Sequence, residues 1–222
     1  MHLPISSRLL ACAAFVAPGE RIADMGCDHG YLSIYLLQNG IARSAIAADI
    51  NEGPLQSARR NSAKFGIADK ITFHLSSGVN NVPRDFDTMI CAGMGADTMI
   101  SILSDAPWLK SQQYRLILQC QSKTPSLRQY LSQQGWHLKK ESILRDGRFL
   151  YTVMEVVWQP DAPRLTSAQW YFPPVLLDNP RQELAEYHQR LTKRLRVSVT
   201  GHADNAKADE IEALEYLDSM KF

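Results

Sequence analysis

Short apolar runs alternate with amphipathic segments along the chain as far as Gly135. A short apolar run predicts a buried strand, whereas apolar residues three or four apart predict one face of a helix. Pro54 falls in the first turn of one predicted helix, and Gly40 follows the end of another. The expected strands are 21–24, 44–49, 70–75, 88–91 and 114–119, and the expected helices are 5–16, 31–38, 54–65, 96–103 and 125–133.

The pattern changes after Gly135. Residues 137–144 and 149–158 read as two strands, and Arg145-Asp-Gly-Arg148 joins them. Asp-Gly between apolar runs is a strong hairpin signal, because the tight turn needs residues that accept positive φ. A series of alternating strands and helices that ends in a hairpin predicts an α/β fold. Its sheet would be mostly parallel and seven-stranded, with an antiparallel last strand.

A second unit is expected after the segment Gln159-Pro-Asp-Ala-Pro163, which divides the chain into predicted domains 1–160 and 161–222. The tail carries two apolar stripes at helical spacing. The first stripe consists of Leu184, Tyr187, Leu191 and Leu195, and the second of Ile211, Leu214 and Leu217. Narrow stripes favour a small helical hairpin or coiled coil over a larger globular domain.

The composition is that of an ordinary globular protein, since 45% of the 222 residues are hydrophobic and 21% are charged. A net charge of +1 excludes a polybasic protein, although a local basic face can still bind nucleic acid. No apolar run reaches the ~18 residues of a membrane span, and we interpret the apolar stretch 9–17 as part of the fold rather than a leader. The four cysteines have no C-x-x-C spacing, so we expect no metal site, no disulfide framework and a cytoplasmic protein.

The segment Asp24-Met-Gly26-Cys-Asp28-His-Gly30 follows the first predicted strand, where the ligand of a doubly wound sheet binds. Its glycines permit a tight turn and the close approach of a ligand. It differs from the dinucleotide fingerprint, because Asp28 stands where a pyrophosphate needs bare backbone. A carboxylate suits a cationic ligand such as S-adenosylmethionine, and Asp49 after the second strand suits the ribose hydroxyls. The plainer alternative is that Asp24 and Asp28 only cap the next helix.

Two further strand ends face the same predicted crevice. Gly93, Met94 and Gly95 follow the fourth strand, which indicates a backbone that passes close to a flat or bulky group, with a plain glycine turn as the alternative. Gln119 ends the fifth strand and offers an amide donor and acceptor, which serve either capping or contact with a substrate.

Taken together, these residues resemble the bacterial TrmK family of tRNA adenine-N1 methyltransferases. The resemblance covers residues 5–158 and rests on the segments Ile5-Ser-Ser-Arg8-Leu, Ala23-Asp-Met-Gly-Cys-Asp-His-Gly-Tyr-Leu32, Glu52-Gly-Pro-Leu-Gln-Ser-Ala58, Ala92-Gly-Met-Gly95 and Leu116-Ile-Leu-Gln119. It implies a class I, Rossmann-like methyltransferase domain with a small C-terminal helical coiled-coil domain. It also implies S-adenosyl-L-methionine as cofactor and methylation of adenosine 22 in tRNA. We expect a monomer or a weak dimer.

The resemblance further implies a set of site residues. The cofactor contacts fall on Asp24, Gly26, Asp28, His29, Gly30, Asp49, Ile50, Ser77, Gly78, Ala92, Gly93 and Met94. The contacts with the tRNA fall on Arg8, Gly95, Arg190, Lys193 and Arg194. Asp28 is the candidate for orienting or deprotonating the exocyclic amine of the adenine, and Gln119 is the candidate for reading its edge.

Three positions depart from the family pattern. Ser76-Ser-Gly78 stands where the family usually has Gly-Asp-Gly, so Ser77 can bond the exocyclic amine of the cofactor only without charge assistance. A lower affinity for the cofactor is expected for that reason. Cys120 replaces a proline after Gln119, and Ala96 replaces a second glycine after Gly95.

The sequence leaves other chemistries open. Cys91 or Cys120 would serve as the thiolate for pyrimidine C5 methylation, but neither has a basic neighbour in sequence. His29 is either a base or a polar residue beside the cofactor. The basic residues of the tail are either a solvated face or an RNA phosphate contact, and they are Arg190, Lys193, Arg194 and Arg196. The alternative functions are methylation of another RNA or a protein, and an RNA-binding scaffold without catalysis.

Overall fold

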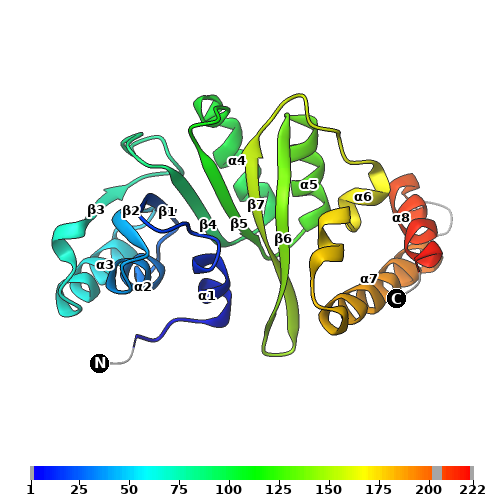
Figure 1. The fold of residues 1–222 in the computed structure, drawn as a ribbon, viewed down its shortest axis with the longest axis horizontal. Helices are drawn as coiled ribbons and strands as arrows, with labels where there is room; N and C mark the ends of the chain where they lie inside the picture. Colours follow the sequence, from blue (N-terminus) through cyan, green and yellow to red (C-terminus); the bar gives the residue numbers. More distant parts are fainter. Residues whose placement is uncertain (1–2, 202–206, 221–222) are drawn as a thin grey trace.

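Seven strands form one mixed sheet in the computed structural model, which describes residues 3–201 and 207–220 (Figure 1). The strand order is β3-β2-β1-β4-β5-β7-β6, and β7 runs antiparallel to both of its neighbours while the other pairs are parallel. The strands are β1 (Glu20–Met25), β2 (Ala42–Asp49), β3 (Ile71–Leu75), β4 (Thr88–Met94), β5 (Arg115–Cys120), β6 (Trp136–Asp146) and β7 (Phe149–Trp158). The predicted fold class is confirmed.

Helices occupy the connections between the strands. The first helix begins two residues later than predicted, because the Ser6 hydroxyl accepts the backbone N–H of Leu9 and so caps it. The α-helices are α1 (Ser7–Ala13), α2 (Tyr31–Gln38), α3 (Glu52–Lys64), α4 (Ala96–Ser104), α5 (Thr124–Gln133), α6 (Ser167–Tyr171), α7 (Arg181–Gly201) and α8 (Ala208–Ser219). Three short 3-10 helices are η1 (Ala68–Lys70), η2 (Pro107–Leu109) and η3 (Pro174–Asp178).

Each face of the sheet has its own hydrophobic core. On one face, Met25 and Leu118 pack with residues of α4 and α5. On the other face, Ile22 and Ile90 pack with residues of α1, α2 and α3. Neighbouring residues of a strand point to opposite faces, so a strand covered on both sides consists almost entirely of apolar residues. The resulting three layers bring the carboxyl ends of β1, β2, β4 and β5 to one edge of the sheet.

The tail has a small core that includes part of the sheet. Ile143 of β6 belongs to the same apolar cluster as residues of η3, α7 and α8, so the tail packs beside the edge strand (Figure 1). The remaining buried members of the cluster are Tyr171, Phe172, Leu176, Leu184, Leu191, Leu195, Ala213 and Leu217. Sequence analysis missed α6, which begins with a reciprocal capping box between Thr166 and Gln169. The division at residue 160 stays a prediction.

Arg128 connects the tail to the sheet from inside the protein. Its guanidinium, on α5, pairs with the Glu141 carboxylate of β6 and donates to the carbonyls of Trp170 and Tyr171. A fourth contact reaches the hydroxyl of Tyr187 on α7. One buried side chain therefore touches β6, α6 and α7 at once.

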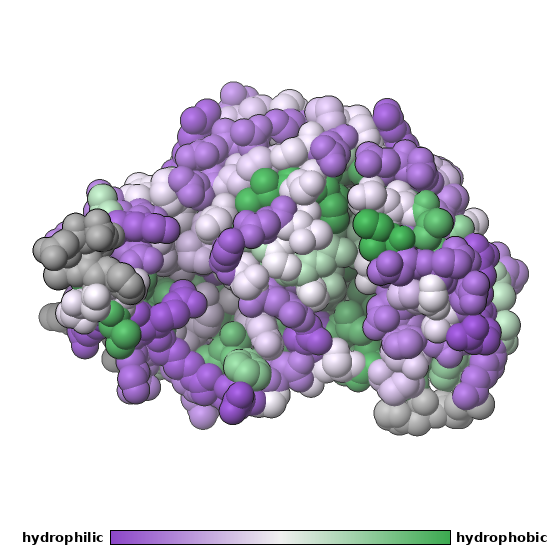
Figure 2. Space-filling model, turned by 180° about the vertical axis from the view of Figure 1, so that it is seen from behind, coloured by the Kyte–Doolittle hydropathy of each residue, from purple (hydrophilic) through white to green (hydrophobic). Residues whose placement is uncertain are grey.

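The side of the molecule opposite to the view of Figure 1 is mostly hydrophilic, with hydrophobic side chains gathered in hollows between the polar ones (Figure 2). Within residues 3–201 and 207–220, no helix combines the length and the hydropathy that crossing a bilayer requires. The same part of the chain holds no group of three His, Cys, Asp or Glu side chains arranged to bind a metal ion.

Candidate active site

The turn after β1 is packed against the end of β4. Gly26 has a φ of +70°, and a Cβ at this position would lie 2.3 Å from Cε of Met94. Gly30 has a φ of +73°, and a Cβ there would lie 3.0 Å from the Cβ of Ala58 on α3. Positive φ and these short approaches both favour glycine, so the two predicted glycines allow the chain to turn tightly at this edge.

Asp24 lies beneath this turn and is buried. Its carboxylate accepts a hydrogen bond of 2.8 Å from the hydroxyl of Ser33 on α2. Burial raises the pKa of the Asp24 carboxyl to about 6, the bonds from Ser33 oppose that change, and the neighbouring charge of Asp49 adds to it. The geometry makes Asp24 a link between β1 and α2.

Asp49 ends β2 with a carboxylate that two backbone groups hold in place. One oxygen accepts the N–H of Asn51 at 2.9 Å, and the other accepts the N–H of Asp28 at 3.2 Å. A carboxylate has about four lone-pair sites, so each oxygen keeps one for a further donor. This arrangement fixes the carboxylate and leaves it able to accept two hydroxyl groups of a ligand.

A pocket of about 150 Å³ opens beside Asp49. Ile50 forms its rim, with 65% of its surface exposed. Ser77 and Gly78 also line the pocket, and Gly78 has a φ of +57°. The predicted residues that line the pocket are Gly26, Asp49, Ile50, Ser77, Gly78 and Met94.

Sequence analysis missed the contribution of α4 to this pocket. Thr98, Ser101, Ile102 and Asp105 line it, and Asp105 brings a carboxylate to the pocket that Ser77 borders. Their spacing of three or four residues places them on one helix face. A helix after β4 was predicted, but its sequence carries no sign that this face covers a cavity.

Asp28 and His29 lie in the same loop but outside the walls of this pocket. Asp28 has a φ of +49° and an exposed carboxylate, which lies 3.6 Å from Nε2 of His29. The His29 ring is half exposed and tilts against Tyr31 at a centroid distance of 5.6 Å. The backbone of Asp28, rather than its side chain, makes the contact with Asp49.

Gln119 holds the irregular turn at Gly93, near the end of β4, from within the sheet. Its side-chain oxygen accepts the N–H of Gly93 at 3.1 Å, and its side-chain nitrogen donates to the carbonyl of Cys120. Gly93 interrupts the pairing of β4 with β5, so its N–H needs this partner. Gln119 has no exposed surface, and reading a base edge would require surface that the residue lacks. Ala92 is the half-buried residue that pairs with Gln119 across the strands.

Arg8 reaches the same turn from α1. Its Nε donates to the Asp146 carboxylate of the β6–β7 hairpin at 2.8 Å, and its guanidinium lies over the ring of Tyr151. Its Nη1 comes within 3.7 Å of the point where a Cβ on Gly93 would stand. The predicted substrate residue Gly95 follows two residues after Gly93, and a Cβ on Gly95 would lie 2.8 Å from the hydroxyl of Ser122.

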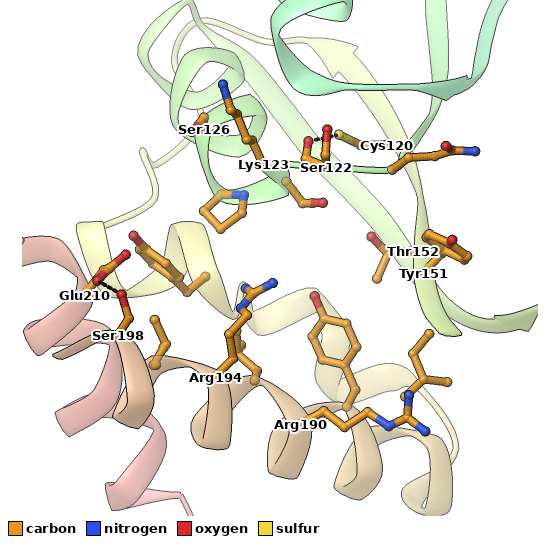
Figure 3. Close-up of a pocket in the computed structure, with 18 of the residues that line it drawn as sticks. Cys120, Ser122, Lys123, Ser126, Tyr151, Thr152, Arg190, Arg194, Ser198 and Glu210 are labelled. Atoms are coloured by element: carbon orange, nitrogen blue, oxygen red, sulfur yellow. Dashed lines mark hydrogen bonds between the residues drawn. The ribbon is translucent and has the colours of Figure 1, made fainter. Parts of the chain in front are cut away.

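A second, larger cavity of about 950 Å³ separates the strand ends from the tail (Figure 3). In Figure 3 the Arg194 side chain extends from α7 into the cavity, towards the loop that holds Ser122 and Lys123. Arg190 extends along α7 instead and donates to the carbonyl of Arg148 in the β6–β7 turn. Arg190 pairs with Glu186 one helical turn away, whereas Arg194 has no ion-pair partner within the described residues. We call this cavity the tail cleft.

Lys193 does not share the tail cleft with the two arginines. It lies with Arg196 on another side of α7, beside a shallow groove that Asp218 of α8 also borders. Arg196 pairs with Asp218 at 2.6 Å. The basic residues that sequence analysis grouped together therefore divide between two faces of the helix.

All four cysteines are buried and free. Burial raises the pKa of the Cys91 thiol to about 12, and burial also raises the pKa of Cys120. The Cys120 thiol donates to the carbonyl of Ser122. A thiolate nucleophile needs a lowered pKa and access to its substrate, so this geometry argues against the cysteine alternative.

The doubly wound sheet, the reversed last strand and the acid-and-glycine site at the carboxyl edge define a class I methyltransferase fold. Residues 5–154 match the family model described as "Methyltransferase domain", so the chain belongs to that methyltransferase family.

The similar proteins include enzymes that act on tRNA. The chain is 32% identical over 154 residues to the tRNA (adenine(22)-N(1))-methyltransferase of Bacillus subtilis, a match that covers 69% of this chain and 65% of that protein's length. The crystal structure of the B. subtilis m1A22 tRNA methyltransferase TrmK superposes with a TM-score of 0.82 at 26% identity, covering 98% of this chain and 95% of that one. The resemblance to the TrmK family is confirmed.

A cofactor-bound structure is among the similar ones. A Streptococcus pneumoniae protein in complex with S-adenosyl-L-methionine superposes with a TM-score of 0.82 at 29% identity. The superposition covers 96% of this chain and 99% of that chain, so the likeness extends through the helical tail as well as the sheet.

Proposed function

We propose that this protein is an S-adenosyl-L-methionine-dependent methyltransferase that modifies N1 of adenosine 22 in tRNA. The observation that carries the proposal is the arrangement of the site: the pocket beside the Asp49 carboxylate lies next to a wide cleft that two arginines line. The names of the B. subtilis relatives supply the base and the position.

The residues of the smaller pocket fit the cofactor. Asp49 keeps two acceptor sites for the ribose hydroxyls, and Ile50 offers an exposed apolar side chain for one face of the adenine. Ser77 supplies a hydroxyl for the exocyclic amine. Gly26 keeps the backbone of the first turn bare where the ligand passes. When bound, the cofactor supplies an electrophilic methyl group on a positively charged sulfur.

Adenine N1 needs no covalent activation by the protein, because its lone pair is already nucleophilic. In the transfer, N1 forms a bond to the methyl carbon as the carbon–sulfur bond breaks, and the positive charge moves to the base. The protein therefore needs only to align N1 with the methyl group and to exclude other orientations of the base. Asp28 is our candidate for the group that orients the exocyclic amine or accepts its proton.

The tail cleft is the proposed path of the tRNA backbone. Arg190 and Arg194 line it from α7, and Lys123 lines it from the start of α5. Guanidinium and ammonium groups bind phosphates and release the counterions that surround RNA. Arg8 is our candidate for a contact with the RNA strand nearest the target base, because the Arg8 guanidinium lies beside Gly93.

The test is a transfer assay with the purified full-length chain. The protein is incubated with tRNA and with cofactor labelled in its methyl group, and the tRNA is digested to nucleosides for mass spectrometry. We expect the label in N1-methyladenosine. Label in a different nucleoside, or in the protein, would contradict the proposed substrate, and absence of label would contradict catalysis.

A further inference from the structure

Gln121 stands where the cofactor pocket and the tail cleft meet. Its side chain lines the cleft and is exposed, while its backbone N–H donates to the carbonyl of Met94 at 2.8 Å. Met94 lines the cofactor pocket. A base that enters from the cleft must cross this short stretch of backbone to reach a methyl group held in the pocket.

Two side chains come close to Gly93 at this junction. The Gln121 Nε2 lies 3.5 Å, and the Arg8 Nη1 lies 3.7 Å, from the point where a Cβ on Gly93 would stand. A guanidinium only donates hydrogen bonds, whereas a carboxamide both donates and accepts. Of these two groups, only Gln121 can accept a hydrogen from an exocyclic amine and donate to a ring nitrogen.

Two other polar residues next to this junction do not offer this combination. Gln119 has the same chemistry, but both of its amide atoms are engaged with backbone and the residue is fully buried. Ser122 is exposed beside Gly95, but a single hydroxyl cannot make two parallel bonds to a base edge.

We infer that Gln121 selects adenine by a bidentate contact with its Hoogsteen edge, an inference that rests on the proposed function. Adenine presents an acceptor at N7 and a donor at N6 on that edge, which a carboxamide matches. The Watson–Crick edge cannot serve, because N1 must stay free to react. Guanine presents two acceptors on its Hoogsteen edge and would leave the Gln121 oxygen facing O6.

The test combines a protein variant with an altered substrate. Full-length wild-type protein and Gln121→Leu are compared on two tRNAs, one with adenosine and one with 7-deazaadenosine at the target position. Leucine keeps the side chain similar in size and removes both polar atoms. Gln113→Leu is the matched control, since Gln113 is exposed and lies before β5, at the other end of the strand. Cofactor affinity is measured by calorimetry for each protein.

We expect Gln121→Leu to lower kcat/KM on the adenosine tRNA about tenfold, as the loss of one or two hydrogen bonds implies. Loss of N7 should lower kcat/KM of the wild type about fivefold, and should have no further effect on Gln121→Leu. Cofactor affinity and the Gln113→Leu control should match the wild type. If the wild type is active but the effects of Gln121→Leu and of 7-deazaadenosine on kcat/KM multiply, the inference is overturned and the proposed function stands. The same holds if Gln121→Leu leaves activity unchanged. A wild type inactive on both tRNAs would overturn the proposed function and this inference with it.

Discussion

The Arg128 guanidinium and the Glu141 carboxylate form an ion pair of 2.6 Å in which neither side chain has more than 1% of its surface exposed. The pair joins α5 to β6 inside the protein, and the same guanidinium donates to the carbonyls of Trp170 and Tyr171 in the tail. The position of the tail cleft therefore depends on an interaction inside the protein.

Arg128→Met should destabilise the protein strongly, because Glu141 would remain buried without a partner. We expect a decrease of about 3–5 kcal/mol in the free energy of unfolding, measured by urea denaturation. The double variant Arg128→Met with Glu141→Met should recover part of that decrease. Arg196→Met is the control, since its pair with Asp218 is about half exposed and should be worth about 0–1 kcal/mol. Equal decreases for Arg128→Met and Arg196→Met would contradict the assignment.

Asp49→Ala should weaken cofactor binding. The substitution removes the acceptor atoms that we assign to the ribose, so the binding free energy should fall by about 1.5–3 kcal/mol. Calorimetry with S-adenosyl-L-methionine measures the effect, and Asp69→Ala serves as a control at an exposed acid on η1. An unchanged affinity of Asp49→Ala would show that the ribose lies elsewhere.

Asp24 should make the cofactor-free protein less stable as the pH rises. Its folded pKa of about 6 lies above the ordinary value of 3.8, so the unfolded chain releases the proton first. Stability is therefore lost between pH 3.8 and about pH 6, and the loss should be on the order of 2–3 kcal/mol. Asp24→Asn cannot ionise, so its stability relative to the wild type should rise across that interval in urea denaturation. A constant difference between the two proteins from pH 4 to pH 7 would refute this explanation.

Arg190→Gln with Arg194→Gln should weaken tRNA binding and reduce its dependence on salt. Removing one phosphate interaction should lower the slope of log affinity against log salt by about 0.7–0.9. Lys193→Gln with Arg196→Gln removes the same charge from another face of α7 and should have a smaller effect. Point substitutions are preferable to removal of the tail, because a truncated chain would lack the carbonyl partners of Arg128. Equal slopes for the two double variants would contradict the proposed path of the RNA.

Local patterns predict the sheet well because each strand has a simple physical signature. Strands covered by helices on both faces are apolar throughout, and the Asp-Gly turn located the hairpin, whose second strand begins and ends at the predicted residues Phe149 and Trp158. The short helix α6 was missed although Thr166 and Gln169 carry a capping-box signature, because it occupies only five residues.

At the candidate site, the sequence predicts backbone turns better than it predicts the partners of side chains. The tight turn at Gly26 and Gly30 could be predicted, because both residues adopt positive φ and a Cβ at either position would approach a neighbouring side chain closely. Gln119 was given a role in base recognition because the sequence does not reveal that its side-chain oxygen accepts a hydrogen bond from the N–H of Gly93. The burial of Arg128 was not predicted, because an arginine is rarely buried unless it is paired and its partner Glu141 lies on a different element.

The most direct test of the account is to map the methylated position in a defined tRNA. Two transcripts that differ only in adenosine or guanosine at position 22 are incubated with the protein and S-adenosyl-L-methionine, and reverse transcription then reports where N1 methylation blocks base pairing. The account predicts a cofactor-dependent stop at position 22 in the adenosine transcript and an unchanged guanosine transcript. A stop at another adenosine, or identical results for both transcripts, would contradict it.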